Sequence, residues 1–157
     1  MMVMVDNNFL IRLVDDNQTY RIFLQSLERS EISLGLPTPV VAEFLVKDDN
    51  YERATFLSKV NSFTQTFDFD MKSALVSAEI FRNLLDIGYI KENNRERQVI
   101  KVDIQIISIT LANRVSRLYT ADKGIVEIID QLDLPIEVIN FEKDELLGMT
   151  LFESLID

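Results

Sequence analysis

The stretch that decides the fold is residues 100–131, IKVDIQIISITLANRVSRLYTADKGIVEIIDQ. Its isoleucine-rich part, within residues 99–115, suits a strand as well as a buried helix. We expect a helix through the second half of that part, because only a short turn then separates it from the strand-like residues 117–120. Residues 122–132 have the spacing of another helix. Helix, strand and helix in this order are part of an alternation that, repeated along the chain, indicates a parallel sheet covered on both faces.

The same alternation of strands and helices runs through the rest of the chain. We expect strands over residues 1–5, 32–36, 66–70, 117–120 and within 134–141, and helices over 8–14, 20–27, 38 onward, 48–63, 71–88, the second half of 99–115, and 122–132. The polar residues 91–97 are expected to form a surface loop. This order predicts an α/β fold with three layers, α/β/α, around a central parallel sheet. Without an internal repeat or a linker, one domain is expected over residues 1–157.

Residue types at the expected helix ends suggest how several helices are capped. Short polar side chains favour the N-cap position, and proline favours the first helical position. Gly88 suits the C-terminal stop of the helix before it. The expected N-caps are, in chain order, Asn8, Thr38 followed by Pro39, Asp49 or Asn50, and Asp70.

The composition excludes several kinds of chemistry. The chain has 157 residues, 47% of them hydrophobic, and it contains neither cysteine nor histidine. Disulfides, thiolate metal sites, a cysteine nucleophile, a Ser-His-Asp triad and most zinc sites are therefore excluded. Hydrolysis would have to rest on carboxylates, hydroxyls, lysines or a hard metal ion bound by oxygen. No apolar run reaches the length of a membrane span and the N-terminus lacks the basic flank of a signal peptide, so we expect a cytoplasmic protein.

The net charge of −10 argues against nonspecific binding to nucleic acid, which normally requires an excess of basic residues. A local basic rim is compatible with that global charge. Arg95, Arg97 and Lys101 form one cluster in the sequence and could contact the phosphates of an RNA. A solvated polar loop explains the same three residues equally well.

Four acidic residues stand where an α/β layout would bring them together. Asp6 and Asp122 directly follow expected strands. Glu43 lies in the second turn of the helix that follows LPTP, and Asp103 lies near the start of KVDIQIISITLA. Ligands of an open parallel sheet bind outside the carboxyl ends of its strands, so these side chains are expected to converge. Four carboxylates at one rim repel one another strongly unless a divalent cation lies among them, which predicts a Mg²⁺ or Mn²⁺ site.

Each acid also has a purely structural explanation. Asp6 and Asp122 could cap the helices that follow them. Glu43 could be a solvated helix residue, and Asp103 could complement the positive end of its helix. These explanations do not exclude a metal site, because one carboxylate can serve both purposes.

Taken in order, these motifs resemble those of a PIN domain. They are the acid after the first strand, the glutamate in the helix after PTP, KVD at residues 101–103 and YTADK at residues 119–123. The strongest resemblance is to the VapC-like toxin ribonucleases of bacterial toxin–antitoxin pairs, and it covers residues 2 to about 142. It implies a metal-dependent endoribonuclease that uses Mg²⁺ or Mn²⁺ and cleaves RNA. It also implies an antitoxin as partner, and a homodimer.

The resemblance assigns a role to each acid of the quartet. Asp6 and Asp103 would bind the metal most directly, and Asp122 would join them through water or at a second ion. Glu43 would hold water or act as a base. All four would then count as catalytic residues.

Two further positions match the family pattern and two depart from it. Asn8 and Thr120 match polar residues that would orient the ligands. Asn7 stands where Thr or Ser is usual. Gly124 stands where many relatives carry another acid, so a second metal site could be weaker here.

Two other functions are compatible with an α/β chain of this kind. One is a PIN-like module that binds protein or RNA and has lost efficient metal binding and catalysis. The other is a response-regulator receiver, which needs a phospho-acceptor aspartate after its third strand. Asp68 and Asp70 are poor candidates for that role, and a receiver has no place for the helix that follows Glu43.

The C-terminal residues 143–157 are expected to form a helical extension. Leu147, Leu151 and Leu155 recur at helical spacing. Packing onto the same domain would bury them, and contact with a second copy or with an antitoxin is the alternative.

Overall fold

The computed structural model describes residues 1–48, 51–91 and 96–142, and the expected C-terminal helix lies outside these ranges. Its centre is a sheet of five strands in the order β3-β2-β1-β4-β5, in which every neighbouring pair is parallel. The strands are β1 (Met2–Val5), β2 (Ser33–Pro37), β3 (Thr64–Phe67), β4 (Arg117–Tyr119) and β5 (Glu137–Ile139). The α/β fold with a central parallel sheet is therefore confirmed. Receivers have the strand order 2-1-3-4-5, so that alternative is wrong.

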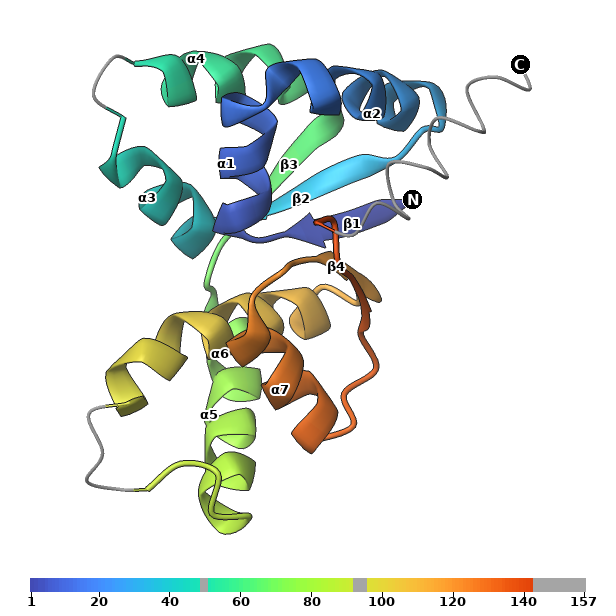
Figure 1. Ribbon diagram of the computed structural model, residues 1–157. Coiled ribbons are helices and arrows are strands. Elements are labelled where there is room, and N and C mark those ends of the chain that lie inside the picture. The colour runs from blue at the N-terminus through green and yellow to red at the C-terminus, as the bar shows by residue number, and fades with distance from the viewer. Residues whose placement is uncertain (49–50, 92–95, 143–157) are drawn as a thin grey trace.

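Helices cover both faces of the sheet (Figure 1). Helix α1 contacts α2, α3 and α4 on one side, while α5, α6 and α7 pack together on the other. Their bounds are α1 (Asn7–Asp15), α2 (Asn17–Arg29), α3 (Thr38–Val46), α4 (Glu52–Lys59), α5 (Met71–Asp86), α6 (Glu96–Ala112) and α7 (Lys123–Gln131), and a 3₁₀ turn covers Asn61–Phe63. Within the described part of the chain, none of these helices has both the length and the apolar composition to cross a membrane.

The strand order creates a crevice beside β1. The chain moves from β1 outward to β2 and β3, then returns to the other side of β1 for β4 and β5. At such a reversal, the helices that follow the two central strands lie on opposite faces and leave space at the carboxyl edge. Asp6 follows β1 and Asp122 lies just beyond β4, so the topology brings both acids to this edge.

A cluster of aromatic rings holds α1 against the sheet. The ring of Phe9 is fully buried, and its centroid lies 5.1 Å from that of Tyr119 and 5.2 Å from that of Phe141. Phe23 of α2 meets the same cluster edge-on, 5.8 Å from Phe9. Because Phe9 is three residues beyond Asp6, this packing fixes the first turn of α1 and with it the carboxylate of Asp6.

Two expected N-caps are wrong. Asp6, and not Asn8, caps α1, because Asp6 has extended dihedral angles and its Oδ1 accepts a hydrogen bond of 2.9 Å from the N–H of Phe9. Pro37, and not Thr38, occupies the N-cap of α3. The reason is that β2 extends through Pro37, which pairs with Phe67, so the helix starts directly where the strand ends.

Other helix ends agree with expectation. Asp70 caps α5 by accepting a 2.8 Å hydrogen bond from the N–H of Ser73, and Gly88 follows α5 with a φ of 75°. Residues 49 and 50, the expected caps of α4, lie outside the described ranges. The carboxylate of Asp48 instead accepts hydrogen bonds from the N–H groups of Arg53 and Ala54, at 3.0 and 2.9 Å.

Helix α6 is longer than expected. It runs from Glu96 to Ala112, so it includes part of the stretch expected to be a polar loop and both halves of the isoleucine-rich stretch except its last three residues. Ile100, Ile104 and Ile107 recur at intervals of three and four residues, which places them on one face of a helix. A helix needs apolar residues only at its buried positions, so the polar residues between them did not mark its end.

Candidate active site

The carboxyl edge of the sheet contains a cavity of about 540 Å³ that all four acids of the expected quartet line. They come from four different parts of the fold: the end of β1, helix α3, helix α6 and the loop before α7. The complete lining is Asp6, Asn7, Asn8, Glu43, Ile100, Val102, Asp103, Ile106, Asp122, Gly124 and Ile125. The structure thus brings together the acids that the sequence separates by up to 116 residues.

Asp6 is held by hydrogen bonds to both of its carboxylate oxygens. Oδ1 accepts a hydrogen bond from the N–H of Phe9, and Oδ2 accepts one from the hydroxyl of Thr120. The side chains of Asp6 and Thr120 are almost completely buried, with 3% and 0% of their surface exposed. Asp6 is therefore a helix cap and a rigid cavity residue together.

Thr120 also orients the loop that carries Asp122. Its Oγ1 accepts a 3.0 Å hydrogen bond from the N–H of Asp122 while its hydroxyl hydrogen points to Asp6. Asp122 in turn caps α7, since its Oδ1 accepts from the N–H groups of Gly124 and Ile125 at 2.7 and 3.2 Å. One oxygen of Asp122 is used for this cap, and the other accepts no hydrogen bond from the described residues.

Asp103 lies in the second turn of α6, directly opposite the start of α7. A Cβ atom placed on Gly124 would approach Oδ2 of Asp103 to 2.9 Å and Oδ1 of Asp122 to 3.1 Å. A side chain at position 124 would therefore have to push one of these carboxylates away. Gly124, which sequence reasoning treated as a departure, is what lets the two acids approach each other. Neither oxygen of Asp103 accepts a hydrogen bond from the described part of the chain.

Glu43 and Asn8 form the outer part of the cavity. Both residues are exposed and both line the space, Glu43 from α3 and Asn8 from the first turn of α1. Glu43 is thus a solvated helix residue, and it also lies at the rim of the cavity. Asn8 does not cap α1, so its side chain is available to the cavity.

Sequence reasoning missed the contribution of Asn7. Its side-chain Oδ1 is buried, and among the described residues no donor lies within hydrogen-bond distance. A buried acceptor without a partner is unfavourable unless water or a ligand supplies the donor. Asn7 lines the acidic cavity, so a water molecule or ligand there can satisfy it.

Burial and the crowding of the acids shift the pKa of two of them. Burial, together with the smaller effect of the negative charges of Asp122, Glu43 and Asp6, raises the pKa of Asp103 to about 7. Burial likewise raises the pKa of Asp6 to about 6, although the hydrogen bonds from Thr120 and Phe9 act in the opposite direction. Both carboxyls consequently hold protons at a pH where ordinary aspartates are ionised.

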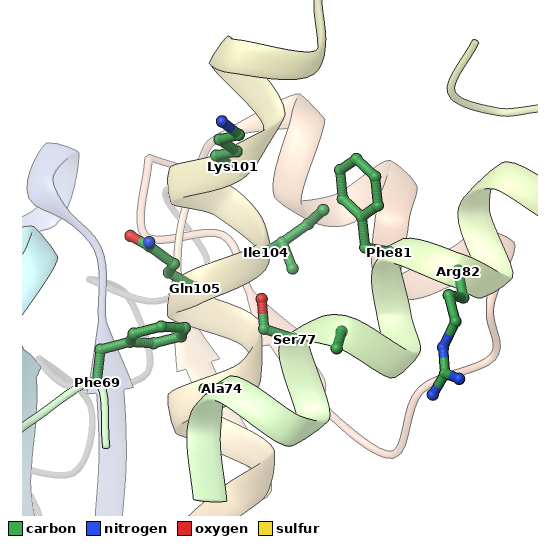
Figure 2. Close-up of a pocket in the computed structure, with 9 residues that line it drawn as sticks. Phe69, Ala74, Ser77, Phe81, Arg82, Lys101, Ile104 and Gln105 are labelled. Carbon is green, nitrogen blue, oxygen red and sulfur yellow. The ribbon is translucent and has the colours of Figure 1, made fainter. Parts of the chain in front are cut away.

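Of the three residues of the expected basic cluster, the structure describes only the side chain of Lys101. Arg95 lies outside the described residues, and Arg97 is in α6, although its side chain is outside what the structure describes. Lys101 lines a separate groove between α5 and α6 (Figure 2). The acidic cavity has no lysine or arginine in its lining among the described residues.

The donor set of the cavity suits a hard cation. Carboxylate and amide oxygens are the ligands that Mg²⁺ and Mn²⁺ prefer. However, within residues 1–48, 51–91 and 96–142 no three acidic side chains are placed closely enough to form a ready-made metal cluster. The acids surround one cavity and repel one another, so a cation would draw them inward.

Without divalent ions, the stability of the domain is expected to fall as pH rises from about 4 to about 7. The reason is that Asp6 and Asp103 have pKa values of about 6 and about 7 in the folded chain, above the ordinary value of 3.8. Folding then favours their protonated forms, and the resulting stability is lost as pH rises through those values. Chemical denaturation in a chelator across this pH range measures the effect.

Asp103→Asn should remove most of the pH dependence above pH 6, because the group that titrates there is gone. Asp130→Asn, a change at an exposed acid of α7, provides the matched control and should keep the wild-type slope. A wild-type protein whose stability rises between pH 4 and 7 would show that the carboxylates are not crowded in solution.

No family model and no curated protein matches this chain. Solved structures do match it. VapBC2 from Rickettsia felis bound to a DNA fragment from their promoter contains a chain with 19% identity and a TM-score of 0.66, and the match covers 89% of this chain and 98% of that one. DNA-bound VapBC from Salmonella typhimurium gives 15% identity and a TM-score of 0.61, over 88% and 98% of the two chains. VapBC-1 from nontypeable Haemophilus influenzae gives 18% identity and a TM-score of 0.62, and the match covers 91% of this chain and 100% of that one.

At identities this low, the structural similarity shows the fold alone. The activity has to be inferred from the site. Each match spans nearly the whole of both chains, so the similarity concerns the complete domain. The chain therefore has the PIN-like fold found in VapBC toxin–antitoxin complexes, as the resemblance in its sequence motifs led us to expect.

Proposed function

We propose that this protein is a metal-dependent endoribonuclease that hydrolyses RNA phosphodiester bonds as the toxin of a toxin–antitoxin pair in the cytoplasm. The observation that carries the proposal is the convergence of Asp6, Glu43, Asp103 and Asp122 on one cavity at the carboxyl edge of the sheet. The fold shared with VapBC complexes supports a toxin nuclease. The absence of histidine and cysteine from the chain leaves oxygen ligands as the means of catalysis.

Asp103 and Asp6 are the residues best suited to hold Mg²⁺ or Mn²⁺. Both oxygens of Asp103 are free of hydrogen bonds from the described residues, so the side chain can rotate to meet an ion. Asp6 is held in one orientation by Thr120 and by the N–H of Phe9. A divalent ion would lower the pKa of an attacking water and neutralise charge on the phosphate.

The other cavity residues would position these groups and the substrate. Asp122 has one oxygen outside its helix cap and would support the ion through water or at a second position. Glu43, at the exposed rim, would accept a proton from the attacking water. Asn8 and Asn7 supply amide groups beside the acids. Thr120 would hold Asp6 and Asp122 in fixed relative positions, because it is hydrogen-bonded to both residues.

A second candidate is a PIN-like binding module without efficient catalysis. The observation that favours it is that the described acids do not form a ready-made metal cluster. Gly124 adds no carboxylate, and the net charge of −10 disfavours RNA unless cations intervene. Measuring cleavage with and without metal distinguishes the two candidates.

Replacing Asp103 with asparagine should abolish manganese-dependent cleavage of RNA while leaving the domain folded. We expect the rate to fall by about a hundredfold or more, since a metal ion contributes several kcal/mol and each ~1.4 kcal/mol is a factor of ten. The same variant should lose most of the rise in melting temperature that Mn²⁺ produces in the wild type. Fluorescent RNA cleavage and thermal melts measure the two effects.

Asp130→Asn serves again as the control, because Asp130 is an exposed acid of α7 outside the cavity lining. It should cleave RNA and respond to Mn²⁺ as the wild type does. An unchanged metal-induced shift in Asp103→Asn would mean that the ion binds elsewhere.

Expression of the wild-type chain alone should slow bacterial growth and degrade RNA, whereas Asp6→Asn should be tolerated. Asparagine is also a good N-cap, so it can keep the hydrogen bond from the N–H of Phe9 while removing the negative charge. Growth curves with RNA profiles measure the outcome. The variant must accumulate to the wild-type level for the comparison to be valid.

We further propose that the partner is an antitoxin that inserts a cationic side chain among the four acids. A lysine or arginine there would satisfy the carboxylates and exclude metal and substrate together. The solved VapBC structures contain both members of such a pair. If wild-type expression is harmless and the purified protein with Mn²⁺ cuts no RNA, the binding module replaces the toxin.

A further inference from the structure

Helix α4 covers its side of the domain incompletely. None of its residues is buried, and its two largest apolar side chains, Phe56 and Leu57, are only half-buried where they pack against the core. Phe56 meets the fully buried ring of Phe44 at a centroid distance of 6.4 Å. Large apolar side chains inside a domain are usually covered completely, so an apolar surface remains open beside α4.

This surface lies in a groove between α1, α2 and α4. The groove has a volume of about 520 Å³. Its polar edge is formed by Glu52, Thr55 and Lys59, three exposed residues of α4. An apolar floor with a polar edge is typical of grooves that accept the apolar face of an amphipathic helix. The floor consists of Leu13 and Val14 of α1, Leu24 of α2, Phe56 of α4, and Val60 directly after α4.

The described part of the chain ends beside the same groove. Phe141 is fully buried, and Oε1 of Glu142 accepts a hydrogen bond of 3.3 Å from Nη2 of Arg12. Arg12 directly precedes Leu13 and Val14, the two residues of α1 that line the groove. The ion pair therefore fixes residue 142 alongside the helix that forms one wall of the groove.

The sequence of residues 143–157 suits this groove in pattern and in length. Leu147, Leu151 and Leu155 recur every four residues, so they share one side of a helix, and Glu153 falls on the opposite side. Fifteen residues in a helix span about 22 Å, whereas the eight residues of α4 span about 12 Å. The segment is thus long enough to leave Glu142 and still run along the whole groove.

We propose that residues 143–157 fold back as an amphipathic helix and occupy the groove between α1, α2 and α4 of the same chain. The leucines then cover Leu24 and Phe56, and their burial stabilises the docked state. A segment tethered beside its groove has an effective concentration in the millimolar range, which favours it over the same segment of a second copy. A partner that uses the groove has to displace the segment first.

The groove is separate from the acidic cavity. The two spaces share no lining residue among those that the structure describes. Asn7 and Asn8 at the start of α1 line the cavity, whereas Leu13 and Val14 near its end line the groove. The inference therefore does not depend on the nuclease, and its test measures a distance in place of activity.

The distance between two nitroxide labels in the full chain tests the proposal. The chain contains no cysteine, so Thr55→Cys on α4 and Thr150→Cys in the segment provide the only two attachment sites. We expect a narrow distance distribution centred at roughly 15–30 Å, because packed helices lie about 8–10 Å apart and each label adds its own length. Leu151→Glu should broaden the distribution, since the loss of one buried leucine lowers the docking equilibrium constant by roughly tenfold or more.

Leu75→Glu is the matched control, because Leu75 is 66% exposed on α5 at the other side of the sheet. It should leave the distance distribution unchanged, and thermal melts check that both glutamate variants are folded. An excess of unlabelled chain should also leave the distribution unchanged, since both labels belong to one molecule.

Three outcomes would overturn the inference. Loss of the short distance on dilution with unlabelled chain would assign the groove to the segment of a second copy. A broad distribution without Leu151→Glu would leave the groove to a separate partner. A narrow distribution that Leu151→Glu does not change would mean that the leucines do not hold the segment in place.

Discussion

The hydrogen bond from Thr120 to Asp6 is the contact on which the geometry of the acidic cavity depends. It joins the two central strands at their carboxyl ends, because Asp6 follows β1 and Thr120 follows β4. The same hydroxyl oxygen accepts the N–H of Asp122, so one buried threonine determines the relative position of two acids. Removing it would leave Asp6 buried with one oxygen unsatisfied and would free the loop before α7.

The cavity combines features that oppose folding with features that suit a cation. Burial and mutual repulsion raise the pKa of Asp6 and Asp103, which costs stability at neutral pH. The ring cluster around Phe9 and the caps at the starts of α1 and α7 hold the acids in place against that repulsion. Carboxyl groups with raised pKa values in well-packed surroundings are typical of functional sites.

The order of strands and acids could be read from the sequence because both follow from local signals. Apolar runs that end in an acid mark the strand ends, and parallel strands bring those ends to one edge. Features that depend on tertiary contacts could not be predicted. The role of Gly124, where a side chain would collide with the carboxylates of Asp103 and Asp122, follows only from the packing of α6 against α7. The groove between α1, α2 and α4 was also missed, since helical spacing alone does not reveal which apolar side chains stay partly uncovered.

The most direct test of the account is to locate Mn²⁺ by anomalous diffraction in crystals of the full chain. The account predicts one strong peak inside the acidic cavity, within roughly 2–2.5 Å of carboxylate oxygens that include one from Asp103. The side chains of Asp103 and Asp122 should lie closer to the centre of the cavity than they do in the structure without the ion. An ordered Mn²⁺ ion outside the cavity, or an empty cavity at a concentration that supports RNA cleavage, would contradict the account.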